Sequence, residues 1–338
     1  MRSLADTLRR IKGFRSVPEV PTRSSPRLRP LNRFGLNPGG LRAWCHVPAN
    51  ITPAPALVVA LHGCTQSASV YDHCSGWSGL GEERGFAVLF PEQVRSNNTN
   101  LCFNWFNPVD VRRDSGEAMS IRQMIDHMVD RYCLDRNRIF ITGLSAGGAM
   151  ANAMLAAYPE VFTAGAILAG LPYMSASTVP QAFDRMRGYG LPSGLALQAK
   201  LRSASDHEGS WPAISVWHGG GDDTVAPANA RAIVDQWRGV HCVQSRPTIS
   251  QQRGDHTLQI WQDATGRDVI ELHTLAAMGH GAPIDIAKGY EKDGPFFLDI
   301  GVSSTLEAAR AWGLGDTKPG EFSFTRMLGP WRAGRKPL

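Results

Sequence analysis

The segment Gly143-Leu-Ser-Ala-Gly147 constrains the fold of this 338-residue chain more than any other. It follows a β-branched run, 138–142, and precedes an Ala-rich run with helical composition, 149–157. A serine between two glycines at a strand-to-helix turn is typical of a nucleophile elbow. The glycines are needed because a Cβ at either position would collide with the adjoining strand or helix. The segment therefore predicts that Ser145 is presented above one edge of a sheet. The alternative is a buried serine in an ordinary turn.

Strand-like and helix-like runs alternate along most of the remaining sequence. The expected strands cover residues 41–47, 56–61, 85–90, 138–142, 165–169, 213–217, 257–261 and 268–273, and the expected helices cover 71–85, 116–132, 149–157 and 302–312. This alternation predicts an α/β fold with a mostly parallel central sheet and helices on both faces. Pro91 is expected to end its strand, and residues 263–266 are expected to form a hairpin turn. Sites in such sheets lie at the carboxyl ends of the strands.

The N-terminal segment differs in charge from the rest of the chain. Residues 1–33 contain nine Lys or Arg and two acidic residues, so their net charge is +7. The net charge of the whole chain is +5, so the remaining residues have a net charge of −2. We expect residues 1–33 to be a mobile extension and 34–338 to be a single domain, with 172–212 as a cap over the site. Apolar residues at helical spacing near the start would suit contact with a hydrophobic granule or surface. A solvated tail, or a helix docked on its own domain, is the alternative.

Composition excludes several classes of protein. With 43% apolar and 19% charged residues, the chain has the composition of an ordinary globular protein. No apolar run is long enough for a transmembrane helix. The body shows no Lys/Arg stripe interleaved with aromatic residues, which argues against a nucleic-acid partner. The start lacks the continuous apolar segment of a secretory signal, so the cytoplasm is the expected compartment, with secretion or the periplasm as the alternative.

Cysteine usage gives no sign of a metal centre. The six cysteines form no C-x-x-C pair and have no histidine spacing typical of zinc. The first interpretation is therefore a set of reduced, partly buried thiols. The residues concerned are Cys45, Cys64, Cys74, Cys102, Cys133 and Cys242.

A carboxylate and a histidine each follow an expected strand downstream of Ser145. One strand runs into a glycine-rich segment that contains Asp222 and Asp223, and a later one leads to His280 between two glycines. A serine nucleophile needs an imidazole base, and the base needs an orienting carboxylate. We therefore expect Ser145, Asp222 and His280 to meet at one edge of the sheet. The alternatives are a plain surface turn for the aspartates, another of the ten histidines as the base, and Asp223 as the acid.

A developing oxyanion on such a site needs two backbone N–H donors. One is expected from Ala146, the residue after the serine. The other is expected from Cys64, which lies in the segment His62-Gly-Cys-Thr-Gln66 after the strand 56–61. The glycine in this segment permits close approach, and the His62 side chain is expected to brace the loop rather than to react.

Several short motifs then occur in a fixed order between residues 39 and 283. They are His62-Gly-Cys-Thr-Gln66, Ser75-Gly-Trp77, Pro91-Glu-Gln93, Cys102-Phe-Asn-Trp-Phe106, Gly143-Leu-Ser-Ala-Gly-Gly-Ala-Met150, Tyr158-Pro-Glu-Val-Phe162, His218-Gly-x-x-Asp222-x-x-Val225 and Gly279-His280. With these motifs the chain resembles the polyhydroxybutyrate depolymerase-like esterases, whose near relatives are the feruloyl and acetylxylan esterases. The resemblance implies an α/β-hydrolase fold, a mechanism without metal or cofactor, and hydrolysis of carboxyl esters.

The resemblance also implies roles for individual residues. It assigns the nucleophile, the acid, the base and the two oxyanion amides to Ser145, Asp222, His280, Cys64 and Ala146, in that order. The expected substrates are poly- or oligo-hydroxyalkanoate esters, hydroxybutyrate among them. A feruloyl- or acetylxylan-type carbohydrate esterase is the first alternative, and a non-catalytic granule- or surface-binding protein is the second. No pattern in the sequence indicates an oligomeric state.

Two further expectations come with these motifs. Trp105, Phe103 and Phe106 are candidates for lining a substrate groove, with ordinary core packing as the alternative. Cys64 and Cys102 both lie in family motifs. A disulfide between them would brace the segment 62–66, here called the oxyanion loop. Such a bond would imply an oxidising compartment, against which the missing signal argues.

Overall fold

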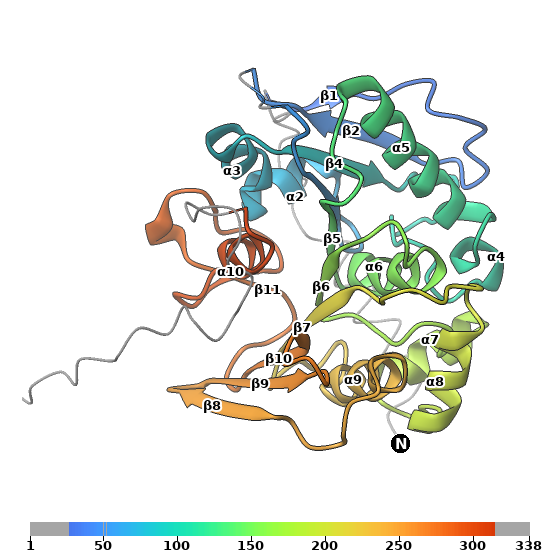
Figure 1. Ribbon diagram of the computed structural model, residues 1–338, viewed down its shortest axis with the longest axis vertical. Helices are drawn as coiled ribbons and strands as arrows, with labels where there is room; N and C mark the ends of the chain where they lie inside the picture. The colour runs from blue at the N-terminus through green and yellow to red at the C-terminus, as the bar shows by residue number, and fades with distance from the viewer. Residues whose placement is uncertain (1–26, 50, 52, 315–338) are drawn as a thin grey trace, which may run out of the picture.

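The computed structural model describes residues 27–49, 51 and 53–314, and its centre is a ten-stranded sheet (Figure 1). The strand order is β1-β2-β4-β3-β5-β6-β7-β10-β9-β8, and all pairs from β4 to β10 are parallel. The expected α/β fold is therefore confirmed. The strands are β1 (Arg29–Pro30), β2 (Arg42–His46), β3 (Leu57–Leu61), β4 (Ala87–Glu92), β5 (Ile139–Leu144), β6 (Ala164–Leu168), β7 (Ala213–Gly219), β8 (Ile249–Arg253), β9 (His256–Gln262) and β10 (Asp268–Leu275), with β11 (Ala282–Ile284) and β12 (Phe297–Asp299) in a separate parallel pair.

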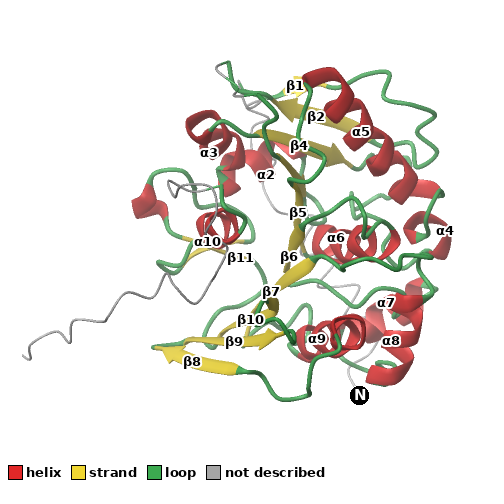
Figure 2. Ribbon diagram, in the orientation of Figure 1, coloured by secondary structure: helices red, strands yellow, loops and turns green. Residues whose placement is uncertain are grey.

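Helices cover both faces of the sheet (Figure 2). One face carries α4 (Pro108–Val111), α5 (Gly116–Tyr132), α6 (Ala146–Ala157), α7 (Val179–Met186), α8 (Gly194–Arg202) and α9 (Ala228–His241). The other face carries α2 (Ala68–Ser75), α3 (Trp77–Arg84) and α10 (Ser304–Ala311), and a 3-10 turn, η2 (Ile286–Lys288), precedes β12. Among the helices of the described ranges, none is both long and apolar enough to cross a membrane.

The alternation of side chains along β3 explains why the sheet has a core on each face. Leu57, Val59 and Leu61 pack in the cluster under α5 and α6, whereas Val58 and Ala60 pack in the cluster under α2, α3 and α10. Successive side chains of a strand point to opposite faces, so a strand buried on both sides must be apolar throughout. Burying each of the larger side chains stabilises the fold by about 1.5–3 kcal/mol.

Two boundaries differ from the expectation. The domain begins before residue 34, because Arg29 and Pro30 pair with β2 and Leu31 is buried with 4% exposure. The segment expected to be an extension therefore includes part of the sheet, while expectations about residues 1–26 lie outside the described residues. Pro91 does not end its strand but pairs with Ala43 inside β4. The pairing of β4 with β3 ends at Leu89, so the missing N–H of Pro91 removes no hydrogen bond between these two strands.

The insertion between β6 and β7 contains α7 and α8, which lie beside α9 on the face that carries α6 (Figure 1). α8 is tied to α9 by a bond from Gln198 Nε2 to the carbonyl of Asp235. Ala182 and Met186 of α7 pack in a small cluster with Trp105. The insertion therefore packs against the loop that contains Trp105. Its role as a cap stays a prediction.

Candidate active site

Ser145 occupies the sharp turn between β5 and α6 that the sequence predicts. Its backbone has φ 57° and ψ −116°, a conformation that L-residues adopt rarely. A Cβ on Gly143 would lie 2.3 Å from the carbonyl oxygen of Gly147, and one on Gly147 would lie 2.4 Å from that of Leu61. Both glycines are therefore required by close backbone contacts, and the serine is held at the carboxyl end of the central strand.

The loops that carry Asp222 and His280 follow two adjacent strands. β10 runs parallel to β7, and the pairing extends to the ends of the strands, where Leu275 faces Gly219. The two loops therefore leave the sheet at the same edge as β5. Gly219 makes their close contact feasible, because a Cβ there would lie 2.2 Å from the carbonyl oxygen of Met278.

The structure brings Ser145, His280 and Asp222 into one chain of hydrogen bonds. Ser145 Oγ lies 3.0 Å from His280 Nε2, and His280 Nδ1 lies 2.7 Å from Asp222 Oδ2. The other carboxylate oxygen, Oδ1, accepts the backbone N–H groups of Thr224 and Val225 at 2.9 and 2.8 Å. The neighbouring residue, Asp223, is exposed. Of the two aspartates, Asp222 is therefore the one whose carboxylate contacts the imidazole.

The surroundings of Asp222 keep it ionised. Burial alone would raise the pKa of its carboxyl, but hydrogen bonds from His218 and His280, the charge of His280 and the Val225 amide together hold the pKa below its ordinary value. An ionised carboxylate holds the proton of the imidazole on Nδ1, which leaves Nε2 free to accept the proton of Ser145. The arrangement can thus activate the hydroxyl for attack on a carbonyl carbon.

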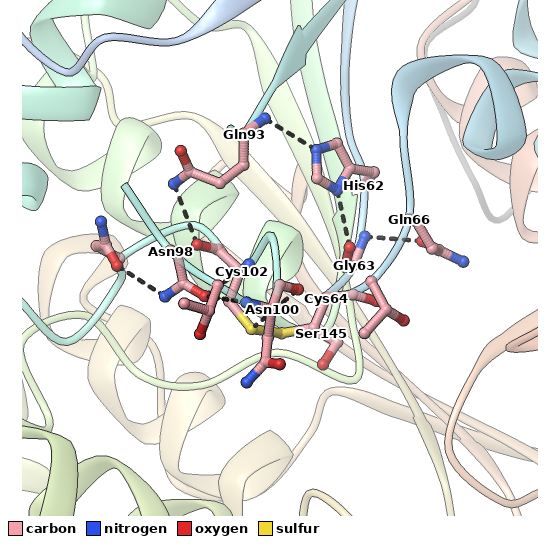
Figure 3. The surroundings of a disulfide bond; sticks show 12 residues. His62, Gly63, Cys64, Gln66, Gln93, Asn98, Asn100, Cys102 and Ser145 are labelled. Atoms are coloured by element: carbon pink, nitrogen blue, oxygen red, sulfur yellow. Dashed lines mark hydrogen bonds between the residues drawn. A yellow bond between two sulfur atoms is a disulfide. The ribbon is translucent and has the colours of Figure 1, made fainter. Parts of the chain in front are cut away.

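Two backbone amides point to an oxyanion site. The N–H groups of Ala146 and Cys64 have no hydrogen-bond acceptor within the described residues. Ala146 is the first residue of α6, so its N–H also lies at the positive end of the helix dipole. Cys64 lies near the serine, since Ser145 is among the residues around its disulfide in Figure 3. Free amides at a helix start attract negative charge.

Cys64 and Cys102 are joined by a disulfide, with 4.2 Å between their Cα atoms (Figure 3). The expectation that all six cysteines are reduced is therefore wrong for this pair. The sequence could not establish the bond, because thirty-eight residues separate the two positions and only the fold brings them together. The remaining cysteines are free, with Cys45 and Cys74 buried and Cys133 and Cys242 exposed.

The three aromatic groove candidates have different environments. Phe103 is fully buried and its ring lies 4.9 Å from that of His62, so it belongs to the core and cannot line a groove. Trp105 is 6% exposed and packs in one cluster with Ala146. Phe106 is partly buried and meets Trp105 edge-on at 5.7 Å. The latter two therefore stay candidates for contact with substrate.

Sequence reasoning missed a buried polar group behind this site. Glu117 is 1% exposed and accepts hydrogen bonds from Gln93 and Asn104. Burial and then the charge of Asp110 raise the pKa of Glu117 to about 8, against the hydrogen bonds of Asn104 and Gln93, which lower it. The available signal was an acidic residue on the same helical face as Ile121, where the core-facing positions are otherwise apolar or small.

No group of three or more His, Cys, Asp or Glu within the described ranges is arranged to hold a metal ion. The candidate site consists of side chains and backbone amides. Its polar elements are the serine, the imidazole, the carboxylate and the two free N–H groups.

The chain is similar to several known proteins along most of its length. Residues 45–251 match the family model described as esterase PHB depolymerase. Poly(3-hydroxyalkanoate) depolymerase C of Paucimonas lemoignei is 40% identical over 84% of this chain and 69% of its own length. Feruloyl esterase B of Talaromyces funiculosus is 25% identical over 79% of this chain and 77% of its own. The solved structure of an acetyl xylan esterase from Aspergillus awamori matches with a TM-score of 0.71 at 26% identity, covering 78% of this chain and 97% of that chain.

Proposed function

This chain belongs to the esterase PHB depolymerase family and is an ester hydrolase, and from that premise we propose that it cleaves hydroxyalkanoate esters through an acyl-enzyme on Ser145. The observation that carries the proposal is the hydrogen-bonded chain from Ser145 through His280 to Asp222 at the end of the central strand. The relative at 40% identity is named a poly(3-hydroxyalkanoate) depolymerase, which supports this substrate class.

The reaction proceeds in two halves. His280 Nε2 takes the proton of Ser145 Oγ as the oxygen attacks the ester carbonyl, and Asp222 stabilises the imidazolium that results. The N–H groups of Cys64 and Ala146 donate to the oxyanion of the tetrahedral intermediate. As the bond to the alcohol breaks, His280 returns the proton to the leaving oxygen. Water then attacks the acyl-enzyme by the same route and releases the acid and the free serine.

The nucleophile is tested by replacing Ser145→Ala and measuring hydrolysis of p-nitrophenyl butyrate. We expect kcat to fall by roughly 10⁴-fold or more, because loss of a triad nucleophile removes the acyl-enzyme route. Ser203→Ala, which changes an exposed serine at the end of α8, is the matched control and should keep full activity. Retained turnover by the Ser145 variant would refute the proposal. A fluorophosphonate should label the unaltered protein but not the variant, which would also exclude a non-catalytic binding protein.

The substrate class is tested with a panel of oligomeric hydroxybutyrate, methyl ferulate and acetylated xylan. The match to the acetyl xylan esterase structure makes a carbohydrate esterase the second candidate. We expect kcat/KM to be highest for the hydroxybutyrate oligomers, because the relative at 40% identity is named for hydroxyalkanoates. A higher value for either plant-derived ester would transfer the assignment to the second candidate.

A further inference from the structure

A buried carboxyl behind the site organises the loop that carries Cys102. Glu117 Oε1 accepts from Gln93 Nε2 at 2.6 Å and from Asn104 Nδ2 at 2.8 Å, and Oε2 accepts from the backbone N–H of Asn104 at 2.9 Å. None of these bonds involves the serine, the imidazole or the acid of the site. Two of these three donors belong to Asn104, so the carboxyl group holds the segment that follows Cys102, and the third belongs to Gln93.

Gln93 connects this carboxyl to the oxyanion loop, residues 62–66. Figure 3 shows the bonds of Gln93 to Cys102 and to His62. The side-chain Nε2 of Gln93 also donates to the carbonyl of Cys102 at 3.1 Å, so both hydrogens of the amide are used. Its backbone N–H donates to His62 Nε2 at 3.1 Å. Because this nitrogen accepts, the proton of His62 lies on Nδ1, which donates to the carbonyl of Gly63 at 2.8 Å. Burial lowers the pKa of His62, which is consistent with a neutral imidazole.

The two loops that Gln93 touches are also joined to each other. Cys64 is bonded to Cys102, and the backbone N–H of Thr65 donates to the carbonyl of Asn100 at 2.6 Å. Asn98 Oδ1 accepts from the N–H of Cys102 at 3.3 Å. The oxyanion loop and the Cys102 loop therefore form one unit, and Gln93 and Glu117 attach this unit to β4 and α5.

We propose that Gln93 and Glu117 are positioning residues that set the direction of the Cys64 N–H toward the oxyanion. The inference rests on the proposed acyl-enzyme function. An oxyanion donor is effective only where its N–H already points at the developing charge, and loss of one such donor costs about 100- to 1000-fold in kcat. The carbonyl of Gly63 belongs to the peptide unit whose N–H is that of Cys64. The bond from His62 to this carbonyl therefore fixes the plane in which the N–H lies.

The test compares Gln93→Met and Glu117→Gln with the unaltered protein. In Gln93→Met the backbone N–H that binds His62 stays, and the side-chain amide that binds Cys102 and Glu117 is removed. In Glu117→Gln one carboxyl oxygen becomes an NH₂ group, which cannot accept a hydrogen bond from Asn104. Glu307→Gln, an exposed carboxylate on α10, is the matched control. We measure kcat and KM for p-nitrophenyl butyrate and the Ki of butylboronic acid, whose tetrahedral adduct on the serine places an oxygen in the oxyanion site. Rates are normalised to the sites labelled to completion by a fluorophosphonate, so unfolded molecules do not count.

We expect kcat to fall by about 10- to 100-fold in both variants, with a matching rise in Ki and with KM unchanged within about two-fold. A purely structural role would change the number of active sites without this split. If kcat and Ki stay within about two-fold of the unaltered protein, the inference is wrong, while an inactive Ser145→Ala variant would still support the proposed function. If Glu117→Gln does not fold, Asn104→Ala removes one of the three donors, and an unchanged kcat and Ki in that variant and in Gln93→Met would equally overturn the inference.

Discussion

His218 donates to the same carboxylate oxygen of Asp222 that binds His280. Its Nε2 lies 3.3 Å from Asp222 Oδ2, while His280 Nδ1 lies 2.7 Å from that oxygen. The same N–H of His218 also reaches the carbonyl of Val225 at 2.8 Å. Both side chains are almost fully buried, so a second imidazole fixes the orientation of the acid from inside the protein.

Removal of the His218 imidazole should lower the activity without abolishing it, because Asp222 keeps its bond to His280. We expect His218→Leu to lower kcat for p-nitrophenyl butyrate by about 10-fold, because a hydrogen bond to a charged group contributes about 1.5–3 kcal/mol. KM should not change, since His218 is buried and its Nε2 contacts only the acid and the carbonyl of Val225 among the bonds described above. His218→Gln, which can still donate an N–H, should retain more activity. Equal loss in both variants would show that packing, not the hydrogen bond, is what His218 supplies.

The two adjacent aspartates should respond very differently to the same change. Asp222→Asn keeps the shape of the side chain but removes the charge that holds the imidazole tautomer, so we expect a loss of about 10⁴-fold in kcat. Asp223→Asn changes an exposed residue and should leave kcat within about three-fold. Steady-state rates with p-nitrophenyl butyrate measure both. The opposite ranking would make Asp223 the acid.

The depressed pKa of Asp222 predicts how acid affects stability. Since the folded pKa lies below the ordinary value of 3.8, the ionised carboxylate stabilises the fold at higher pH, and this contribution is lost as the pH falls below about 4. Urea unfolding of the unaltered protein and of Asp222→Asn, at several values from about pH 6 to about pH 3, measures the difference in free energy of unfolding. We expect the advantage of the unaltered protein to shrink toward the acid end. A constant difference would contradict the lowered pKa.

The glycines of the serine turn should tolerate no side chain. In Gly147→Ala the new Cβ would lie 2.4 Å from the carbonyl oxygens of Leu61 and His62, so we expect a loss of about 1–3 kcal/mol in stability and about 100-fold in kcat. Gly279→Ala is the control, because no heavy atom lies within 4 Å of its added Cβ. Its stability should stay within about 0.5 kcal/mol. Thermal unfolding and steady-state rates are sufficient, and an equally mild effect at both positions would argue against the turn.

The disulfide predicts a specific count of thiols. Denatured protein without reductant should show four free thiols, and reduced protein should show six. Replacing Cys64 and Cys102 with serine should lower the free energy of unfolding by about 3–4 kcal/mol, because the bond closes a loop of 38 residues. Six thiols without reductant would contradict the bond. Four would favour the secreted or periplasmic alternative over the cytoplasm, since disulfides persist in oxidising compartments.

The sequence was sufficient for the features that depend on local pattern. The turn at Ser145 was predicted because glycine spacing and the change from strand to helix are both visible in a short segment. α9 was missed although Ile233, Val234 and Trp237 follow helical spacing and are buried. This helix is therefore one that local pattern alone was sufficient to predict.

Other features depend on contacts that no local pattern contains. The hydrogen bonds of Glu117 come from Gln93 and Asn104, which belong to separate segments, so the sequence shows an acidic residue on a buried face but not its partners. The pairing of Cys64 with Cys102 was left open for the same reason. The burial of Phe103 could not be separated from that of Trp105, because both lie in one aromatic run and only the fold places Phe103 against His62.

The parallel pairing of β10 with β7 has a consequence for the timing of activity during synthesis. Ser145 precedes His280 by 135 residues, and the loop that bears the imidazole reaches the serine only after β10 has joined the sheet. Translation proceeds from the N-terminus, so most of the chain is already made before β10 exists. A ribosome-bound intermediate therefore carries the serine without its base. Attack of this serine on an ester therefore waits until β10, the last strand of the ten-stranded sheet to be synthesised, is in place.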